Sequence, residues 1–137
     1  MYEWMDEWFE WEYKGRIIKL PIDDIYYFCS EGRKTYIHAK NGVYQIGITV
    51  KMIEEKLQEQ PFIRTHNAYL VHLKHLECIG RQEAVIRNGD RIPVSERREH
   101  QAKQETRIYL KQMRITKKGG KTTEIQGVCP VCLKRLG

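Results

Sequence analysis

Hydrophobic residues follow two different spacings along the chain, one typical of strands and one typical of helices. Apolar and polar residues alternate in short runs across residues 9–46 and 62–94, which is the two-residue period of β-strands. Apolar residues in 49–60 and 95–113 follow the wider spacing of an amphipathic helix. The pattern therefore predicts a mainly β fold, with short antiparallel sheets, one short internal helix and a C-terminal helix.

Turn-forming residues and helix caps divide these runs into elements. Thr49 is a candidate N-cap for the internal helix, which Pro61 ends. Ser95 is the matching candidate for the last helix, which we expect to run to about Met113. Hairpin turns are predicted at Lys14-Gly15, Asn41-Gly42 and Asn88-Gly89. The strands expected between these signals cover residues 9–13, 17–20, 25–29, 35–39, 43–46, 69–73, 76–79, 84–86 and 92–94.

Charge is distributed unevenly along the chain. Residues 1–29 hold seven acidic and three basic side chains, a net of −4, whereas residues 30–137 hold eleven acidic and twenty-one basic side chains, a net of +10. A basic region of this size suggests a polyanionic partner, of which nucleic acid is the commonest. A solvated basic surface explains the charge equally well, so charge alone does not decide between them.

The length of 137 residues suits a single domain. We expect a short aromatic and acidic lead-in over residues 1–8, a domain over 9–113, and a flexible basic tail over 114–137. No uncharged run is long enough for a transmembrane helix, and the first residues, MYEWMDEWFEW, lack the basic and apolar order of a secretion signal. The sequence therefore predicts a cytoplasmic protein without a membrane partner.

The four cysteines do not have the pattern of a disulfide framework. Cys29 and Cys78 lie in apolar, strand-like runs, where a free buried thiol is expected. Cys129 and Cys132 form a Cys-Pro-Val-Cys motif, which supplies two of the four ligands that a structural zinc ion needs. A zinc site completed by a second chain or a histidine, and an inert tail, both remain open for this motif. No other cofactor is expected.

The sequence gives little support to a second metal site or to an enzymatic activity. His72, His75 and Cys78 stand three residues apart, a spacing that converges on a helix but alternates between the two faces of a strand. Because we interpret this segment as β, we expect no metal site there. No phosphate-binding glycine loop, Ser-His-Asp order or defined carboxylate pair is present, so we expect neither an enzyme nor a small-molecule substrate.

Three motifs carry the most specific pattern: IYYFCSEGRKTYIH at 25–38, FIRTHNAYLVHL at 62–73 and NGDRIPVSERR at 88–98. In this order and with these gaps they resemble the LytTR domain, the mostly β DNA-binding output domain of many bacterial response regulators. The resemblance covers roughly residues 9–112. His72 departs from it, since an asparagine is usual there. Only about eight residues precede the domain, so we expect no fused receiver domain.

The resemblance implies that three places reach DNA, because the family's domains approach successive grooves through loops. Arginine can pair with a guanine edge and asparagine with an adenine edge, each by two hydrogen bonds, while lysine mainly neutralises phosphate. Local roles compete: a structural ion pair for Arg64 and a turn-locking hydrogen bond for His66. Asn67 and Arg97 are the leading candidates for base contacts. Carried over by position, the DNA-binding residues are Arg33, Lys34 and Thr35, then Arg64, His66 and Asn67 in a predicted turn, and Arg97 and Arg98 at the start of the last helix.

The sequence thus predicts a sequence-specific, double-stranded DNA-binding transcriptional regulator, two copies of which bind repeated promoter elements as a homodimer. Two alternatives remain open. One is a protein-interaction or zinc-bridged dimerisation module with weak or no DNA binding. The other is a zinc-dependent RNA-binding module.

Overall fold

The structure, a computed structural model, describes residues 7–116 and, within them, the side chains of residues 7–113. Its helices are α1 (Val50–Lys56) and α2 (Glu96–Thr116), and it also has two short 3₁₀ turns, η2 (Ile22–Asp24) and η3 (Leu73–His75). The predicted mainly β architecture, with a short internal helix and a C-terminal helix, is confirmed. The strands are β1 (Trp8–Tyr13), β2 (Arg16–Pro21), β3 (Ile25–Glu31), β4 (Lys34–Ala39), β5 (Gly42–Ile46), β6 (Phe62–His66), β7 (Tyr69–His72), β8 (Leu76–Ile79), β9 (Glu83–Ile86) and β10 (Arg91–Pro93).

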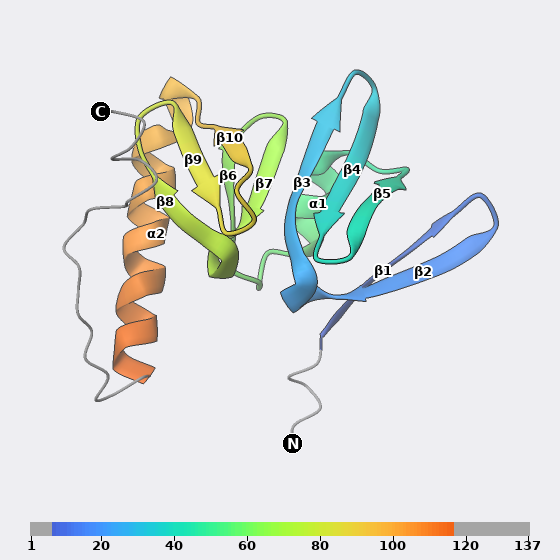
Figure 1. Cartoon of the computed structure of the whole chain (residues 1–137), viewed down its shortest axis with the longest axis horizontal. Helices are drawn as coiled ribbons and strands as arrows, with labels where there is room; N and C mark the ends of the chain where they lie inside the picture. Colours follow the sequence, from blue (N-terminus) through green and yellow to red (C-terminus); the bar gives the residue numbers. More distant parts are fainter. Residues whose placement is uncertain (1–6, 117–137) are drawn as a thin grey trace.

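The strands pair antiparallel in three sheets. A five-stranded sheet has the order β5-β4-β3-β7-β6, a three-stranded sheet the order β10-β9-β8, and β1 and β2 form a separate hairpin. Figure 1 shows the β1–β2 hairpin on one side of the five-stranded sheet, and the three-stranded sheet with α2 on the other. The five-stranded sheet is therefore the middle layer of the molecule.

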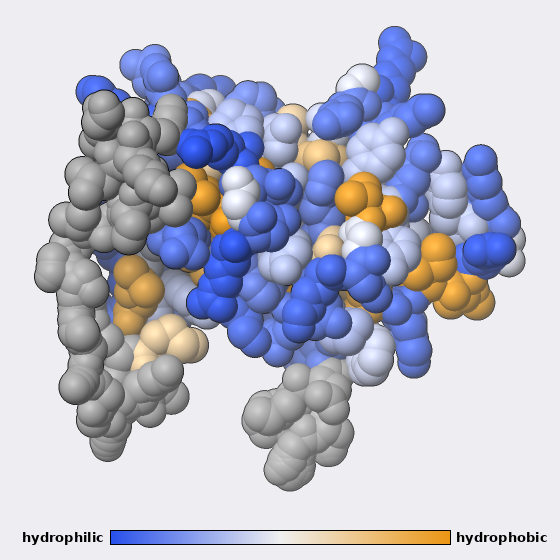
Figure 2. All heavy atoms as spheres, in the orientation of Figure 1, coloured by the Kyte–Doolittle hydropathy of each residue, from blue (hydrophilic) through white to orange (hydrophobic). Residues whose placement is uncertain are grey.

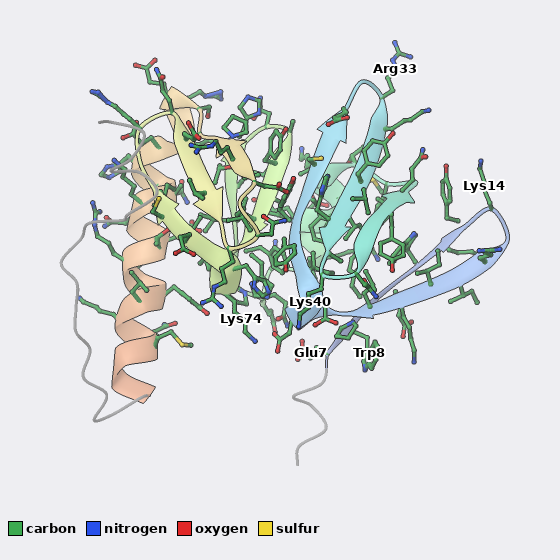
Figure 3. All side chains as sticks on the ribbon, in the orientation of Figure 1. Glu7, Trp8, Lys14, Arg33, Lys40 and Lys74 are labelled. Carbon is green, nitrogen blue, oxygen red and sulfur yellow. The ribbon has the colours of Figure 1, made fainter. Side chains whose placement is uncertain are left out.

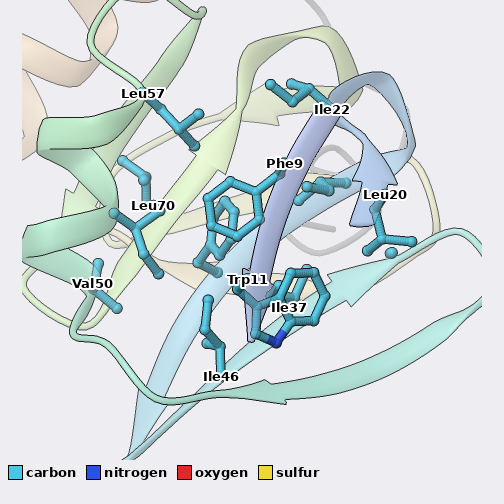
Figure 4. Packing of buried hydrophobic residues seen from close by; sticks show 13 residues of the cluster. Phe9, Trp11, Leu20, Ile22, Ile37, Ile46, Val50, Leu57 and Leu70 are labelled. Atoms are coloured by element: carbon cyan, nitrogen blue, oxygen red, sulfur yellow. The ribbon is translucent and has the colours of Figure 1, made fainter. Parts of the chain in front are cut away.

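Two hydrophobic cores lie on opposite faces of this middle layer. The first packs the β1–β2 hairpin and α1 against the sheet, with Phe9, Trp11 and Ile53 among its members (Figure 4). The second packs the three-stranded sheet and α2 against the other face and includes Ala84, Ile92 and Ala102. Strand β3 contributes to both: Ile25 and Phe28 lie in the first core, and Tyr27 and Cys29 in the second.

Local chemistry explains where several elements begin. Thr49 Oγ1 accepts a hydrogen bond from the backbone N–H of Met52 at 3.1 Å, and Ser95 Oγ accepts one from that of Arg98 at 3.3 Å, so both predicted N-caps are confirmed. The turn of the first hairpin has φ of 52° at Lys14 and 78° at Gly15. Positive φ at both central residues is the geometry that matches the twist of hairpin strands, and glycine adopts it without strain.

The segment that contains His72 and His75 differs from the expected strand. The chain leaves β7 at His72 and enters η3, where three residues make one turn, so the two rings come together with centroids 5.2 Å apart. The prediction that these histidines cannot converge was therefore wrong. Their surroundings are nevertheless those of packed core residues, with exposed fractions of 2% and 8%. Among the described residues, no group of three His, Cys, Asp or Glu side chains is placed to hold a metal ion.

The structure tests the predictions for two of the four cysteines, Cys29 and Cys78. Cys29 is buried and free, as expected. Cys78 is half-buried in β8 and is disulfide-bonded, so the expectation of a free thiol was wrong there. Most of the predicted lead-in and tail, with Cys129 and Cys132, lies outside the described residues. No helix within residues 7–116 is long and apolar enough to cross a membrane.

Candidate functional site

The three segments predicted to reach DNA lie at one end of the molecule. They are the β3–β4 turn, the β6–β7 turn and the first turn of α2, all at the upper end of Figure 1, and we call this surface the loop end. Backbone hydrogen bonds join them: Ser30 N–H donates to Ala68 O at 2.9 Å, and Ser95 N–H donates to Thr65 O at 2.8 Å. Segments far apart in sequence thus form one surface.

The β6–β7 turn is the centre of the loop end. Arg64 and His66 belong to β6, and only Asn67 and Ala68 form the turn, so the predicted four-residue turn is shorter than expected. His66 Nδ1 accepts a hydrogen bond from the backbone N–H of Ala68 at 3.1 Å, which is the turn-locking contact that the sequence left open. In a neutral imidazole this bond places the ring proton on Nε2, which is then a hydrogen-bond donor.

Arg64 supports the turn from behind. Its Nη1 is ion-paired with Glu54 of α1, and its Nη2 donates to the backbone oxygen of Asn67 at 2.8 Å. The Arg64 side chain is only 11% exposed. The structural ion pair weighed for Arg64 is therefore present, and both terminal nitrogens of the side chain are engaged within the protein.

The first turn of α2 brings two arginines to the loop end. Arg97 is exposed and forms no hydrogen bond or ion pair with the described residues. Arg98 donates from Nε and Nη2 to Asn67 Oδ1, at 3.3 and 3.1 Å. Unpaired N–H groups at a helix N-terminus favour an anion, so a phosphate placed here would meet both side-chain and backbone donors.

The β3–β4 turn supplies a third group of cations. The turn consists of Gly32 and Arg33, and Figure 3 shows Arg33 projecting from its tip away from the rest of the molecule. Arg33 and Lys34 are exposed, and no ion pair engages them within residues 7–113. Thr35 lies inside β4 and is 7% exposed, so its side chain contributes to packing in this structure.

Cations at the other end of the molecule behave differently. Lys74 pairs with Asp23 at 3.1 Å, and Lys40 lies 4.0 Å from Asp24; Figure 3 shows both lysines away from the loop end. The surface of the loop end is mostly hydrophilic in Figure 2. Because no ion pair within residues 7–113 engages Arg33, Lys34 or Arg97, an incoming polyanion would not have to displace carboxylates from these three side chains.

Arg81 is a further cation near the loop end that the sequence analysis does not single out. It lies in the turn between β8 and β9, is exposed, and precedes Gln82, whose φ is 69°. The pKa of Glu99 is lowered by its hydrogen bond from Lys103 and by the charges of Lys103 and Arg81, which places Arg81 near the start of α2. The polar Gly80-Arg81-Gln82 break between two apolar runs is the signal that could have identified it.

A hollow of about 240 Å³ lies beside the turn, between α1, β6 and the start of α2. Two glutamates partly offset the charge of its arginines, and its walls include apolar side chains from β6 and α2. Its lining residues are Glu54, Phe62, Ile63, Arg64, Arg97, Arg98, Gln101, Ala102 and Glu105.

Burial controls the titratable groups beneath the turn. It raises the pKa of the Cys29 thiol to about 11, with smaller contributions from Glu31 and Asp90, so Cys29 remains a neutral thiol at physiological pH. Burial also raises the pKa of Tyr69, whose ring contacts His66 edge to face at 5.8 Å. The Cys29 thiol is therefore neutral support under the turn rather than a reactive group.

Residues 15–107 match the family model described as the LytTr DNA-binding domain. The chain belongs to this LytTR family. The family is defined by DNA binding rather than by an enzymatic activity, and its match spans all three segments of the loop end.

Relatives and a solved structure agree with this assignment. The chain is 31% identical over 88 residues to the transcriptional regulatory protein BtsR of Salmonella typhi, and 29% identical over 87 residues to the sensory transduction protein LytT of Enterococcus faecalis. These matches cover 61% and 60% of this chain but only 36% of each relative, so the LytTR chain spans just over a third of their length. A solved LytTr DNA-binding domain from Bacillus cereus has the same fold, with a TM-score of 0.60, 21% sequence identity, and coverage of 72% of this chain and 94% of that one.

Proposed function

We propose that this LytTR domain is a transcriptional regulator that binds double-stranded DNA sequence-specifically through its loop end. Two copies bind repeated elements near a promoter, and the domain acts inside the bacterial cell. The observation that carries the proposal is the convergence of three predicted contact segments, tied together by the Ser30–Ala68 and Arg98–Asn67 hydrogen bonds. The curated relatives BtsR and LytT, named as a transcriptional regulator and a sensory transduction protein, support it.

The proposed contacts fall into two groups by their surroundings. Arg33 and Lys34 are exposed at a hairpin tip and form no ion pair within residues 7–113, which suits contact with phosphates. His66, Asn67, Arg97 and Arg98 surround the rigid turn and the start of α2, which suits contact with base edges and nearby phosphates. Thr35 and Arg64 support these groups from the strands, because their side chains are buried or engaged within the protein.

Selection of bound duplexes from a random pool tests this function. We expect the selected duplexes to share a short sequence present twice at a constant spacing. Their binding should weaken as salt rises, with a linear fall of log affinity against log salt, because phosphate contacts release counterions. Equal affinity for random duplexes, or a preference for single-stranded RNA, would contradict the proposal.

Replacing Arg97 by alanine is expected to weaken binding to the selected duplex by about 1–3 kcal/mol and to relax base preference at one position. The reason is that Arg97 is exposed and has no partner among the described residues, so its donors are available to a base edge. Lys74→Ala is the matched control, since it removes a cation that is paired with Asp23 away from the loop end. Affinities for duplexes changed at single positions measure both effects. A uniform loss across all sequences would instead make Arg97 a phosphate contact.

A further inference from the structure

The orientation of the Asn67 side chain is set by Arg98. The guanidinium directs Nε and Nη2 at the same oxygen, Asn67 Oδ1, over 3.3 and 3.1 Å, although the two residues are 31 positions apart. Arginine has only donors, so the amide must present its oxygen to Arg98 and turn its nitrogen away. Asn67 Nδ2 has no hydrogen-bond partner within the described residues, and Asn67 is exposed. Its two N–H donors therefore face outward.

The backbone of Asn67 is held independently of its side chain. Arg64 Nη2 donates to the Asn67 backbone oxygen at 2.8 Å, and Glu54 holds the other end of that guanidinium. On the other side of the turn, Ala68 N–H donates to His66 Nδ1 at 3.1 Å and Ala68 O accepts from Ser30 N–H at 2.9 Å. The direction in which Asn67 points is thus a fixed property of the turn, which pre-organises it for contact.

This arrangement removes the usual way in which asparagine reads adenine. That contact needs Oδ1 to accept from the adenine amino group while Nδ2 donates to N7. Asn67 Oδ1 already accepts from both Nε and Nη2 of Arg98, so this oxygen is engaged within the protein before DNA binds. The groups left at this point of the surface, Asn67 Nδ2 and the Nε2–H of His66, are donors, and the guanine edge offers two acceptors where adenine offers an acceptor and a donor.

We infer that Arg98 is a specificity-determining positioning residue, which locks Asn67 as a hydrogen-bond donor and makes this point of the loop end select guanine over adenine. The inference rests on the proposed DNA-binding function. It changes the role expected from the sequence, in which Asn67 pairs with adenine and Arg98 acts separately. In the structure the two side chains act as one unit.

Two substitutions separate orientation from charge. Arg98→Lys keeps the positive charge but loses the forked donor pair, and Arg98→Ala removes both. The duplex selected by the unmodified protein is compared with duplexes that carry each other base pair at each position. We expect the unmodified protein to prefer guanine over adenine at one position by about ten-fold or more. Both Arg98 variants should reduce that ratio to about three-fold or less, or reverse it, while Arg98→Lys retains more of the total affinity.

Lys74→Ala is the control, because Lys74 is also cationic but pairs with Asp23 away from the loop end and does not contact Asn67; it should keep the guanine preference. Thermal unfolding of each variant checks that the domain still folds. The same loss of affinity on every duplex, with the guanine-to-adenine ratio unchanged at all positions, would overturn the inference and make Arg98 a phosphate contact. Absence of any sequence preference in the unmodified protein would instead overturn the proposed function, and the inference with it.

Discussion

Lowering the pH from about 7.5 to about 5 is expected to cost the folded domain about 2 kcal/mol of unfolding free energy through His72 alone. Burial, with a smaller contribution from the neighbouring His75, lowers the pKa of His72 from 6.5 to about 3. The His72 ring is 2% exposed, its Nδ1 accepts from the backbone N–H of Lys74, and its Nε2 has no partner among the described residues.

The sign follows from the lowered pKa. A histidine that is harder to protonate in the folded state than in the unfolded state stabilises the fold fully above its unfolded pKa, near 6.5, and loses that contribution as pH falls toward 3. Burial also lowers the pKa of His75 and is the largest cause of that shift. The hydrogen bond to the Asp23 backbone and the Asp23 charge raise this pKa by smaller amounts, while the charges of Lys74 and Arg87 lower it. His75 therefore adds to the loss in acid.

Denaturant unfolding at the two pH values, followed by circular dichroism, measures this effect. His72→Asn should remove about 2 kcal/mol of the pH dependence, because an amide oxygen can still accept from Lys74 N–H but does not titrate. His100→Asn, on the exposed face of α2, is the matched control substitution. An unaltered pH dependence in His72→Asn would show that other groups cause the acid sensitivity.

Replacing Phe28 by alanine is expected to destabilise the domain by about 3–5 kcal/mol. Phe28 is fully buried in β3, and its ring meets those of Phe9 at 5.2 Å and Phe62 at 5.7 Å. The side chain thus joins the β1–β2 hairpin to both halves of the central sheet. Removing it would lose the transfer free energy of the ring and leave a cavity among three elements.

Urea unfolding of purified protein tests this expectation. Phe28→Leu provides a second measurement if the alanine variant is too unstable to purify, and it should cost a smaller part of the same loss. Val43→Ala is the control: Val43 lies on β5 with an exposed fraction of 60%, and its replacement should change stability by less than about 0.5 kcal/mol. A loss below about 1 kcal/mol in both Phe28 variants would mean that the hairpin does not depend on this aromatic contact.

The sequence predicted most elements because the signals involved are local. Thr49 and Ser95 cap helices through bonds three residues away, and Lys14-Gly15 adopts a hairpin geometry that its own backbone favours. Alternation of apolar residues predicted the strands because each has at least one face on a core. The family resemblance then ordered these elements correctly.

The details of the site depended on contacts that no local pattern carries. The Arg98–Asn67 pair joins residues 31 positions apart, and the Arg64–Glu54 pair joins a strand to a helix. Thr35 was expected at the surface, but β4 starts one residue earlier and places its side chain inward. The single 3₁₀ turn η3 could not be predicted from the sequence either, because its three residues are too few to show a helical period.

The position of β3 between the two cores has a consequence for how signals could travel through the molecule. Phe28 faces one core, Tyr27 and Cys29 face the other, and Ser30 at the end of the same strand is bonded to the β6–β7 turn. A shift of β3 would therefore act directly on the backbone of Ala68. Strand β3 thus contacts both regions: the hairpin through the Phe28–Phe9 rings, and the β6–β7 turn through the Ser30–Ala68 hydrogen bond.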